Sequence, residues 1–234
     1  MSISFTSSGL ADDSSSSALF LDNVLRGIGQ VMLQNNSYAG LLFLLGISLN
    51  SGLQALGVLA GAAISTLTAY GLGVNKADIR AGLHGFNGAL VGLAVLIFLA
   101  PSSLTWLTLL LAATFSTLLT LALNRLLSAW QIPAFTAPFV LVSWCLFLSN
   151  ARFGRLESTQ LLPTAGLPSS TVVEGVVTWQ SLLEGALNGI GQVFFQGSVL
   201  TGLVLMPALT LAFVLVTWVV LLANCPSNLA ADKT

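Results

Sequence analysis

The chain alternates long apolar runs with short polar segments, and the length of each run predicts its use. A helix needs about 20 consecutive apolar residues to cross a bilayer whose hydrocarbon core is about 30 Å thick. Residues 53–73, 103–123 and 199–223 approach or reach that length, and residues 136–149 form the uncharged centre of a further candidate. The pattern therefore predicts an all-α fold with several membrane-spanning helices.

Other apolar segments are too short or too rich in glycine to face lipid along their whole length. Residues 38–50 are short for a full crossing, and residues 81–99 begin with a polar, glycine-rich half. Irregular backbone at membrane depth is tolerated only where it faces protein or a cavity. Residues 19–34, 82–92 and 182–196 therefore fit discontinuous helices that line a solute site.

One sequence block occurs twice, which predicts an internal duplication. Residues 25–31 (Leu-Arg-Gly-Ile-Gly-Gln-Val) return 162 positions later as residues 187–193 (Leu-Asn-Gly-Ile-Gly-Gln-Val). Gln34 and Gln196 keep the same register, as do the Gly-Leu pairs that begin at Gly40 and Gly202. In transporters built from such repeats, the solute site lies at the repeat interface near the middle of the bilayer.

The duplication also predicts how the chain is divided. We expect a polar tail at 1–17, a first membrane repeat at 18–150, a linker at 151–178, part of a second repeat at 179–223 and a polar tail at 224–234. The N-terminal tail has neither the basic region nor the early apolar core of a signal peptide. Counterparts of His84, Phe86 and Thr136 would fall at positions 246, 248 and 298, so we expect the second repeat to be incomplete.

Composition narrows the class of protein. Of the 234 residues, 55% are hydrophobic and 6% are charged, against roughly 25% charged in soluble domains, which indicates an integral protein of the lipid bilayer. The net charge of −1 and the seven Lys and Arg residues give no basic surface for nucleic acid. One His, two unrelated Cys and the lack of catalytic or phosphate-binding motifs predict neither an enzyme nor a bound metal or cofactor.

The apolar spans carry no charge at their centres, whereas pumps and proton-coupled carriers normally do. We therefore expect passive passage of a neutral solute, whose lost water must be replaced by polar groups. Gln30, Gln192 and Thr136 are the candidates. The alternative for each Gln is a structural amide that fastens a half-helix to its neighbour. Thr136 lies between Pro133 and Pro138, and its alternative is a hydroxyl bonded to its own backbone.

Residues 84–90 allow similar pairs of interpretations. Phe86 and Leu90 are four positions apart and share a helix face, either toward a pore or in ordinary packing. His84 is either part of a proton relay or a neutral, hydrogen-bonded structural residue, and we favour the latter. Gly57 and Gly61 in the preceding span are expected to permit close helix approach.

Taken together, these motifs resemble the urea transporter family. The matching segments are residues 27–36 with 40–43, residues 82–92 (Gly-Leu-His-Gly-Phe-Asn-Gly-Ala-Leu-Val-Gly), residues 133–139 and the second Gly-Ile-Gly-Gln-Val block. The resemblance implies a polytopic, channel-like protein of two inverted repeats, each with a re-entrant pore half-helix. It further implies a homotrimer in the plasma or inner membrane, with one pore per subunit for facilitated diffusion of urea.

The resemblance also implies a role for each site residue. Gln30 and Gln192 match the acceptors at the ends of the two pore helices, and Thr136 matches the central hydroxyl. The walls of a narrow slot would be formed by Leu33, Phe86, Leu90 and Phe195, with Leu33 in place of the aromatic side chain common there. Urea suits such a slot, and so do short amides. The alternatives are a truncated, non-transporting relative, or a channel for another small neutral solute such as ammonia or water.

Overall fold

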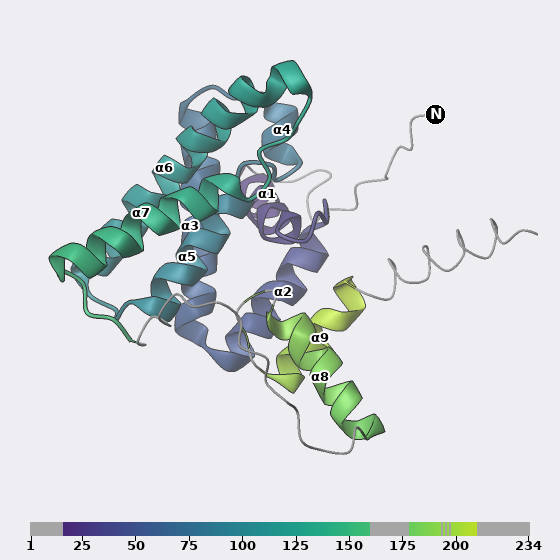
Figure 1. Ribbon diagram of the computed structural model, residues 1–234. Coiled ribbons are helices and arrows are strands. Elements are labelled where there is room, and N and C mark those ends of the chain that lie inside the picture. The colour runs from purple at the N-terminus through teal and green to yellow at the C-terminus, as the bar shows by residue number, and fades with distance from the viewer. Residues whose placement is uncertain (1–15, 160–177, 193, 195, 197, 210–234) are drawn as a thin grey trace, which may run out of the picture.

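The structure, a computed structural model, describes residues 16–159, 178–192, 194, 196 and 198–209, and in these ranges it is built of helices (Figure 1). In chain order they are α1 (Ser16–Gln30), α2 (Ser37–Asn50), α3 (Gly52–Gly71), α4 (Lys76–Arg80), α5 (Phe86–Phe98), α6 (Ser103–Leu127), the 3₁₀ helix η1 (Ser128–Trp130), α7 (Ala137–Phe153), α8 (Trp179–Gln192) and α9 (Val199–Leu209). Extended pairing within the described residues is confined to an isolated bridge between Leu99 and Ser158. The expected all-α class is confirmed.

Two described helices are long and apolar enough to cross a membrane, Gly52–Gly71 and Ser103–Trp130. Both lie where the hydrophobic pattern predicts a span. Helices α2, α5 and α7 are apolar but shorter, with 14, 13 and 17 residues. The span expected at 199–223 is described as far as Leu209, and its remainder lies outside the described residues, as do most of the tail at 1–17, residues 160–177 of the linker and the tail at 224–234.

Helix α5 lies at the centre of the described part of the molecule, because residues 87–97 are all buried. Its most extensive contact is with α3. A Cβ atom at Gly92 would lie 1.9 Å from the carbonyl oxygen of Gly57, and one at Gly61 would lie 2.0 Å from that of Gly88. The two backbones therefore touch through four glycines, which confirms the close approach predicted for Gly57 and Gly61.

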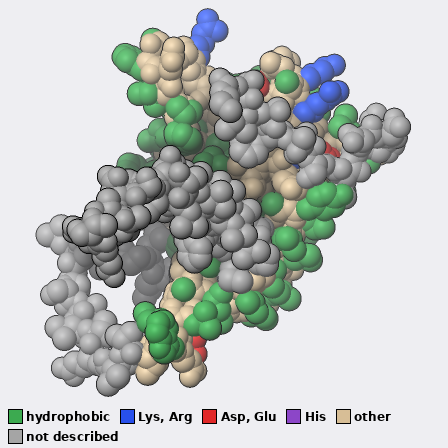
Figure 2. All heavy atoms as spheres, turned by 90° about the vertical axis from the view of Figure 1, so that its right-hand side faces the viewer, with side chains coloured by type: hydrophobic (Ala, Val, Ile, Leu, Met, Phe, Trp, Pro, Cys, Tyr) green, Lys and Arg blue, Asp and Glu red, His purple; other side chains and the backbone are tan. Residues whose placement is uncertain are grey.

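Helices α6 and α7 form a layer over α5, and α6 also packs on α3. Their inner side chains join a buried cluster that includes Val91, Leu109 and Val142. Their outer side chains are exposed and apolar, among them Leu107, Leu111, Phe115, Trp144 and Leu148. In the view of Figure 2, hydrophobic side chains cover much of the described surface, and the Lys and Arg side chains in sight lie at its upper end. Such a surface suits lipid better than water.

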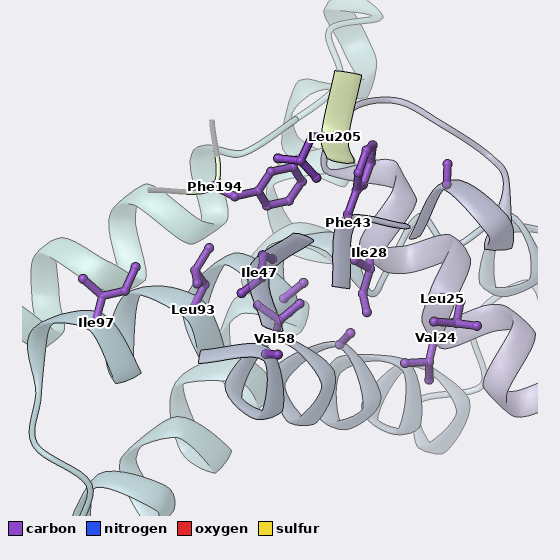
Figure 3. Close-up of a cluster of buried hydrophobic side chains, with 14 residues drawn as sticks. Val24, Leu25, Ile28, Phe43, Ile47, Val58, Leu93, Ile97, Phe194 and Leu205 are labelled. Carbon is purple, nitrogen blue, oxygen red and sulfur yellow. The ribbon is translucent and has the colours of Figure 1, made fainter. Parts of the chain in front are cut away.

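Helices α8 and α9 follow one another, and α9 packs on α2. Gly46 leaves room there for Leu205, whose Cδ2 would lie 3.0 Å from a Cβ atom at Gly46. The rings of Phe43 and Phe194 have centroids 5.1 Å apart and are tilted by 45° (Figure 3). Phe43 and Leu205 are 162 positions apart, so they are equivalent in the duplication, and both are fully buried. The helices that follow the two copies of the repeated block, α2 and α9, thus pack together, and these equivalent residues belong to one buried cluster.

Candidate functional site

Each copy of the repeated block ends its helix at a glutamine that the sequence predicts as a hydrogen-bond acceptor. Helix α1 ends at Gln30 and α8 ends at Gln192. After α1 the chain makes a tight turn in which two amides donate to one carbonyl. The N–H groups of Met32 and Gln34 donate to the carbonyl oxygen of Gly29, at 3.0 and 3.1 Å. The turn brings the chain back over the last turn of the helix.

The turn after α8 has the same hydrogen bonds in the same register. The N–H groups of Phe194 and Gln196 both donate to the carbonyl oxygen of Gly191, at 3.0 Å. A Cβ atom at Gly29 would lie 2.6 Å from the carbonyl oxygen of Gln34, and one at Gly191 would lie 2.4 Å from that of Gln196. Both turns therefore require glycine at this position, because a larger residue would collide with backbone.

Gln30 is buried, with 8% of its surface exposed, and its amide is fixed by one bond. Its Nε2 donates to the carbonyl oxygen of Ala81 at 2.7 Å. Among the described residues, no donor to its Oε1 is seen. The bond to Ala81 is the one expected of a structural amide, and an amide oxygen has acceptor capacity beyond it.

The loop that precedes α5 lies directly on α1. A Cβ atom at Gly82 would lie 2.5 Å from the backbone nitrogen of Gly27, and one at Gly85 would lie 2.9 Å from its Cα. This contact places Phe86, the half-buried first residue of α5, near the end of α1, while Leu90 is buried one turn further along. His84 in this loop is buried, and no described residue bonds to its Nδ1, which differs from the expected hydrogen-bonded histidine.

Asn87 connects this loop to the segment that carries Thr136. Its Nδ2 donates to Oγ1 of Thr120 and to the carbonyl oxygen of Phe135, both at 3.1 Å, and its Oδ1 accepts from the N–H of Phe139 at 3.3 Å. Thr136 is exposed at the N-terminus of α7, and its side chain makes no capping bond. The alternative of a hydroxyl bonded to its own backbone is therefore not what the structure shows.

Leu33 and Gln192 lie at exposed positions. Leu33 is 74% exposed, and its φ of +58° is in the left-handed region, which is strained for a residue with a Cβ atom. Among the described helices, α8 contacts α9 and not α1, so Gln192 is not brought against Gln30. Phe195 lies outside the described residues. Leu33 stays beside Gln30, since its N–H donates to the Gln30 carbonyl oxygen at 2.9 Å, and Leu90 lies one turn from Phe86 on α5. The contacts of the described helices do not bring Gln192 to either pair.

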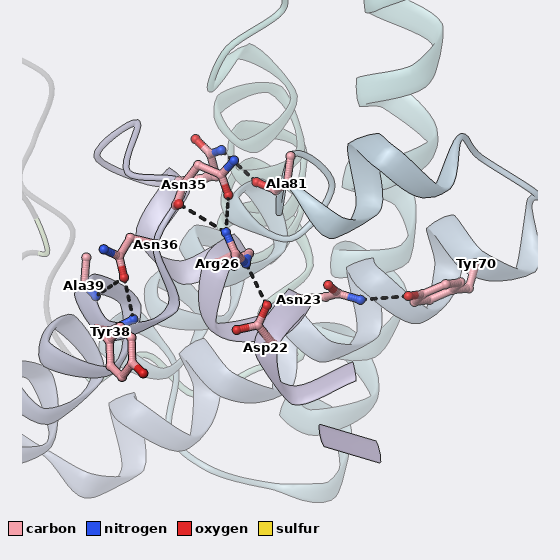
Figure 4. A network of polar contacts seen from close by, with 10 residues as sticks. Asp22, Asn23, Arg26, Asn35, Asn36, Tyr38, Ala39, Tyr70 and Ala81 are labelled. Carbon is pink, nitrogen blue, oxygen red and sulfur yellow. Dashed lines mark hydrogen bonds and ion pairs between the residues drawn. The ribbon is translucent and has the colours of Figure 1, made fainter. Parts of the chain in front are cut away.

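A buried ion pair within α1 holds the turn that follows this helix (Figure 4). The sequence pattern alone did not predict a role for it. Nε of Arg26 donates to Oδ2 of Asp22 at 2.7 Å, and its Nη1 donates to the carbonyl oxygen and Oδ1 of Asn35, at 3.2 and 2.9 Å. Nearby, Nδ2 of Asn23 donates to the hydroxyl of Tyr70 at 2.7 Å. The two opposite charges are four positions apart on one helix, and this spacing in the sequence could have predicted the ion pair.

Asn87 and Gln196 are further residues that the sequence analysis did not select. Asn87 was visible as a polar residue inside the apolar Gly-Phe-Asn-Gly run, and Gln196 as the second glutamine of its block. For each residue, the sequence identifies only a polar side chain within an apolar segment. Its partners are distant in sequence, so they appear only in the folded chain.

Comparison with known proteins agrees with the resemblance. Residues 21–206 match the model of the family described as "Urea transporter". Urea transporter 1 of Ovis aries is 31% identical over 201 residues, which cover 80% of this chain and 50% of the relative. Urea transporter 1 of Rattus norvegicus is 29% identical over 197 residues, which cover 82% of this chain and 51% of the relative.

The chain thus spans about half the length of the curated relatives it matches. Proteins of this family are membrane transporters and not enzymes, in keeping with the two apolar helices and the apolar outer surface described above. The family match covers most of the chain and includes both copies of the repeated block. The chain therefore belongs to the urea transporter family.

Proposed function

We propose that this chain takes part in channel-like facilitated diffusion of urea, and of short amides of similar shape, across a membrane. The observation that carries the proposal is the pair of equivalent helix ends, Gln30 and Gln192, in a chain of the urea transporter family. Urea has four N–H donors and one carbonyl, so it needs acceptors to replace its water. Oε1 of Gln30, to which no described residue donates, is such an acceptor.

In the proposed filter, the acceptors and the apolar walls have separate tasks. Gln30, Gln192 and Thr136 supply oxygens that replace water, because an unpaired polar group costs about 1–3 kcal/mol on burial. The flat slot that selects a planar molecule is walled by Leu33, Phe86, Leu90 and Phe195. None of these residues is charged, so the passage is passive and suits a neutral solute.

We further propose that α1 and α8 are re-entrant half-helices of two inverted repeats. With 15 and 14 residues at about 1.5 Å each, they are close to 20 Å long and too short for a 30 Å hydrocarbon core. The matching turns after the two helices support the same relation. The first repeat would occupy 18–150 and the part of the second 179–223, joined by a linker at 151–178 and flanked by tails at 1–17 and 224–234.

The proposed setting is a multi-pass protein of the plasma or inner membrane, assembled as a homotrimer with one pore per subunit. What supports this setting is the family match, together with the exposed apolar faces of α6 and α7. Oligomeric state in detergent, measured by size-exclusion chromatography with light scattering, tests the assembly apart from the transport.

Urea flux into liposomes that contain this chain, followed by stopped-flow light scattering, tests the function. We expect saturable urea entry above that of empty vesicles, and about a tenfold loss in Gln30→Ala, since one acceptor is removed. Gln34→Ala is the matched control, because the described residues give the Gln34 side chain no hydrogen bond. If the chain is folded and inserted but urea enters no faster than into empty vesicles, the chain is the non-transporting relative. Faster entry of ammonia or water than of urea would assign it to another solute.

A further inference from the structure

Gln196 lies fully buried in the turn that follows α8, and its side-chain amide makes three hydrogen bonds. Its Nε2 donates to Oε1 of Gln54 and to the carbonyl oxygen of Phe194, each at 2.9 Å. Its Oε1 accepts a hydrogen bond from Nδ2 of Asn50. Both amide hydrogens and one acceptor position are thus used, as a buried amide requires.

Two of these partners lie at the corner between α2 and α3, far away in sequence. Asn50 is the last residue of α2, and Gln54 is in the first turn of α3. Ser51 stands between the two helices, and its Oγ accepts the N–H of Gln54 at 3.3 Å. Gln196 is therefore held twice: its backbone N–H closes the turn on α8, and its side chain attaches that turn to a corner of the first half of the chain.

The first copy of the block holds its turn by different means. There Arg26 reaches Asn35 with two hydrogen bonds, and Gln34, the counterpart of Gln196, is half-buried. The second copy has Asn188 in place of the arginine, and the described residues provide no partner for the buried Oδ1 of Asn188. Gly197 stands in place of Asn35, so the second copy has no side chain that could form such a clasp.

We propose that Gln196 is a positioning residue that takes over the task of Arg26 in the second copy. Through Asn50 and Gln54, the first half of the chain fixes where α8 ends, and so where Gln192, four residues earlier, presents its amide. The inference rests on the proposed function for the role of Gln192. The attachment itself is a property of the fold and is tested separately.

Hydrogen–deuterium exchange of the full chain in lipid nanodiscs tests the attachment. The Phe194 and Gln196 amides report directly, since both bond to Gly191. We expect Gln196→Leu to raise exchange in a peptide covering 187–199 by about tenfold or more, because the turn then opens locally. Gln34→Leu, the matched control, leaves exchange in a peptide covering 25–37 within about twofold of the wild-type rate. An unchanged 187–199 peptide in Gln196→Leu, or equal effects of the two variants, would overturn the proposal.

A milder variant keeps the test decisive if Gln196→Leu does not fold. Gln54→Leu removes one of the three bonds and is expected to speed exchange at 187–199 by a smaller factor. In a folded double variant, exchange should equal that of Gln196→Leu, because both changes break the same bond. No change at 187–199 in Gln54→Leu contradicts the attachment.

The positioning role is tested by selectivity and not by rate alone. In liposomes we expect Gln196→Leu to lower the ratio of urea flux to N-methylurea flux, because the displaced α8 fits the smaller solute less closely. A variant that only folds less well loses both fluxes in the same proportion, and the ratio of the two fluxes stays unchanged. An unchanged ratio would therefore refute the positioning role of Gln196. A wild-type chain without urea flux refutes the proposed function, and the exchange result then decides the attachment by itself.

Discussion

Replacing Gly92 by alanine tests whether contact between the α3 and α5 backbones holds the centre of the molecule together. The added Cβ atom would lie 1.9 Å from the carbonyl oxygen of Gly57 and 2.7 Å from its carbonyl carbon. Ordinary van der Waals contact begins at 3.4 Å, so the helices must separate by about 1.5 Å. Both contacting groups are backbone, and no side chain can rotate away to relieve the collision.

The expected cost follows from the burial of α5. Overpacking a close-packed core costs about 1–3 kcal/mol where side chains can adjust. Here a shift of α5 also loosens the contacts of residues 87–97, all of which are buried. We therefore expect Gly92→Ala to lower the free energy of unfolding by about 3 kcal/mol or more, at the upper end of that range.

Unfolding from mixed micelles by increasing fractions of SDS, followed by tryptophan fluorescence, measures this difference. Gly71→Ala is the control on the partner helix, because a Cβ atom at Gly71 meets nothing within 4 Å. Alanine is preferred to glycine in a helix, so the control should be neutral or more stable by up to about 1 kcal/mol. If Gly92→Ala unfolds within about 0.5 kcal/mol of the wild-type protein, the backbone contact does not stabilise this packing.

Three other substitutions test the site at single residues. Leu33→Gly should raise the free energy of unfolding by about 0.5–1 kcal/mol in the same SDS titration, because glycine adopts a φ of +58° without strain. Leu33→Ala keeps a Cβ atom and should give no such increase. Asn87→Leu should lower the free energy of unfolding by about 1–3 kcal/mol, since the N–H of Phe139 loses this acceptor and the carbonyl oxygen of Phe135 loses this donor. Thermal unfolding in detergent would show no shift if these bonds contribute little. Arg26→Met should cost about 3–5 kcal/mol, because it removes the cation paired with the buried Asp22 carboxylate. The double variant with Asp22→Leu should recover part of that loss, and a purely additive double variant would argue against the ion pair.

The positions of the long helices could be predicted from the sequence because they depend on local composition. The apolar runs at 53–73 and 103–123 become α3 and α6, with ends that differ by a few residues. The polar, glycine-rich start of the 81–99 segment was expected to be unsuited to a full membrane-spanning helix, and α5 indeed begins only at Phe86. Such features need no knowledge of distant neighbours.

The candidate site was less predictable because its geometry depends on long-range partners. The sequence identifies Gln30 as polar and repeated, but not the carbonyl of Ala81 that holds it, 51 positions away. It identifies no partner for Asn87 or Gln196, whose bonds reach other helices. The left-handed backbone of Leu33 was also hidden, since leucine is not a residue that signals a positive φ.

The burial of α5 has a consequence for how the chain is made. This helix has 13 residues, about 20 Å, and is shorter than the hydrocarbon core of a membrane. Its Asn87 depends on Thr120, Phe135 and Phe139, which are synthesised 33 to 52 residues later. When α5 leaves the ribosome, neither its length nor its polar end suits lipid, so it cannot settle as an independent span. The hydrogen bonds of Asn87 can form only after α6 and α7 have been synthesised, so the centre of the molecule is completed late.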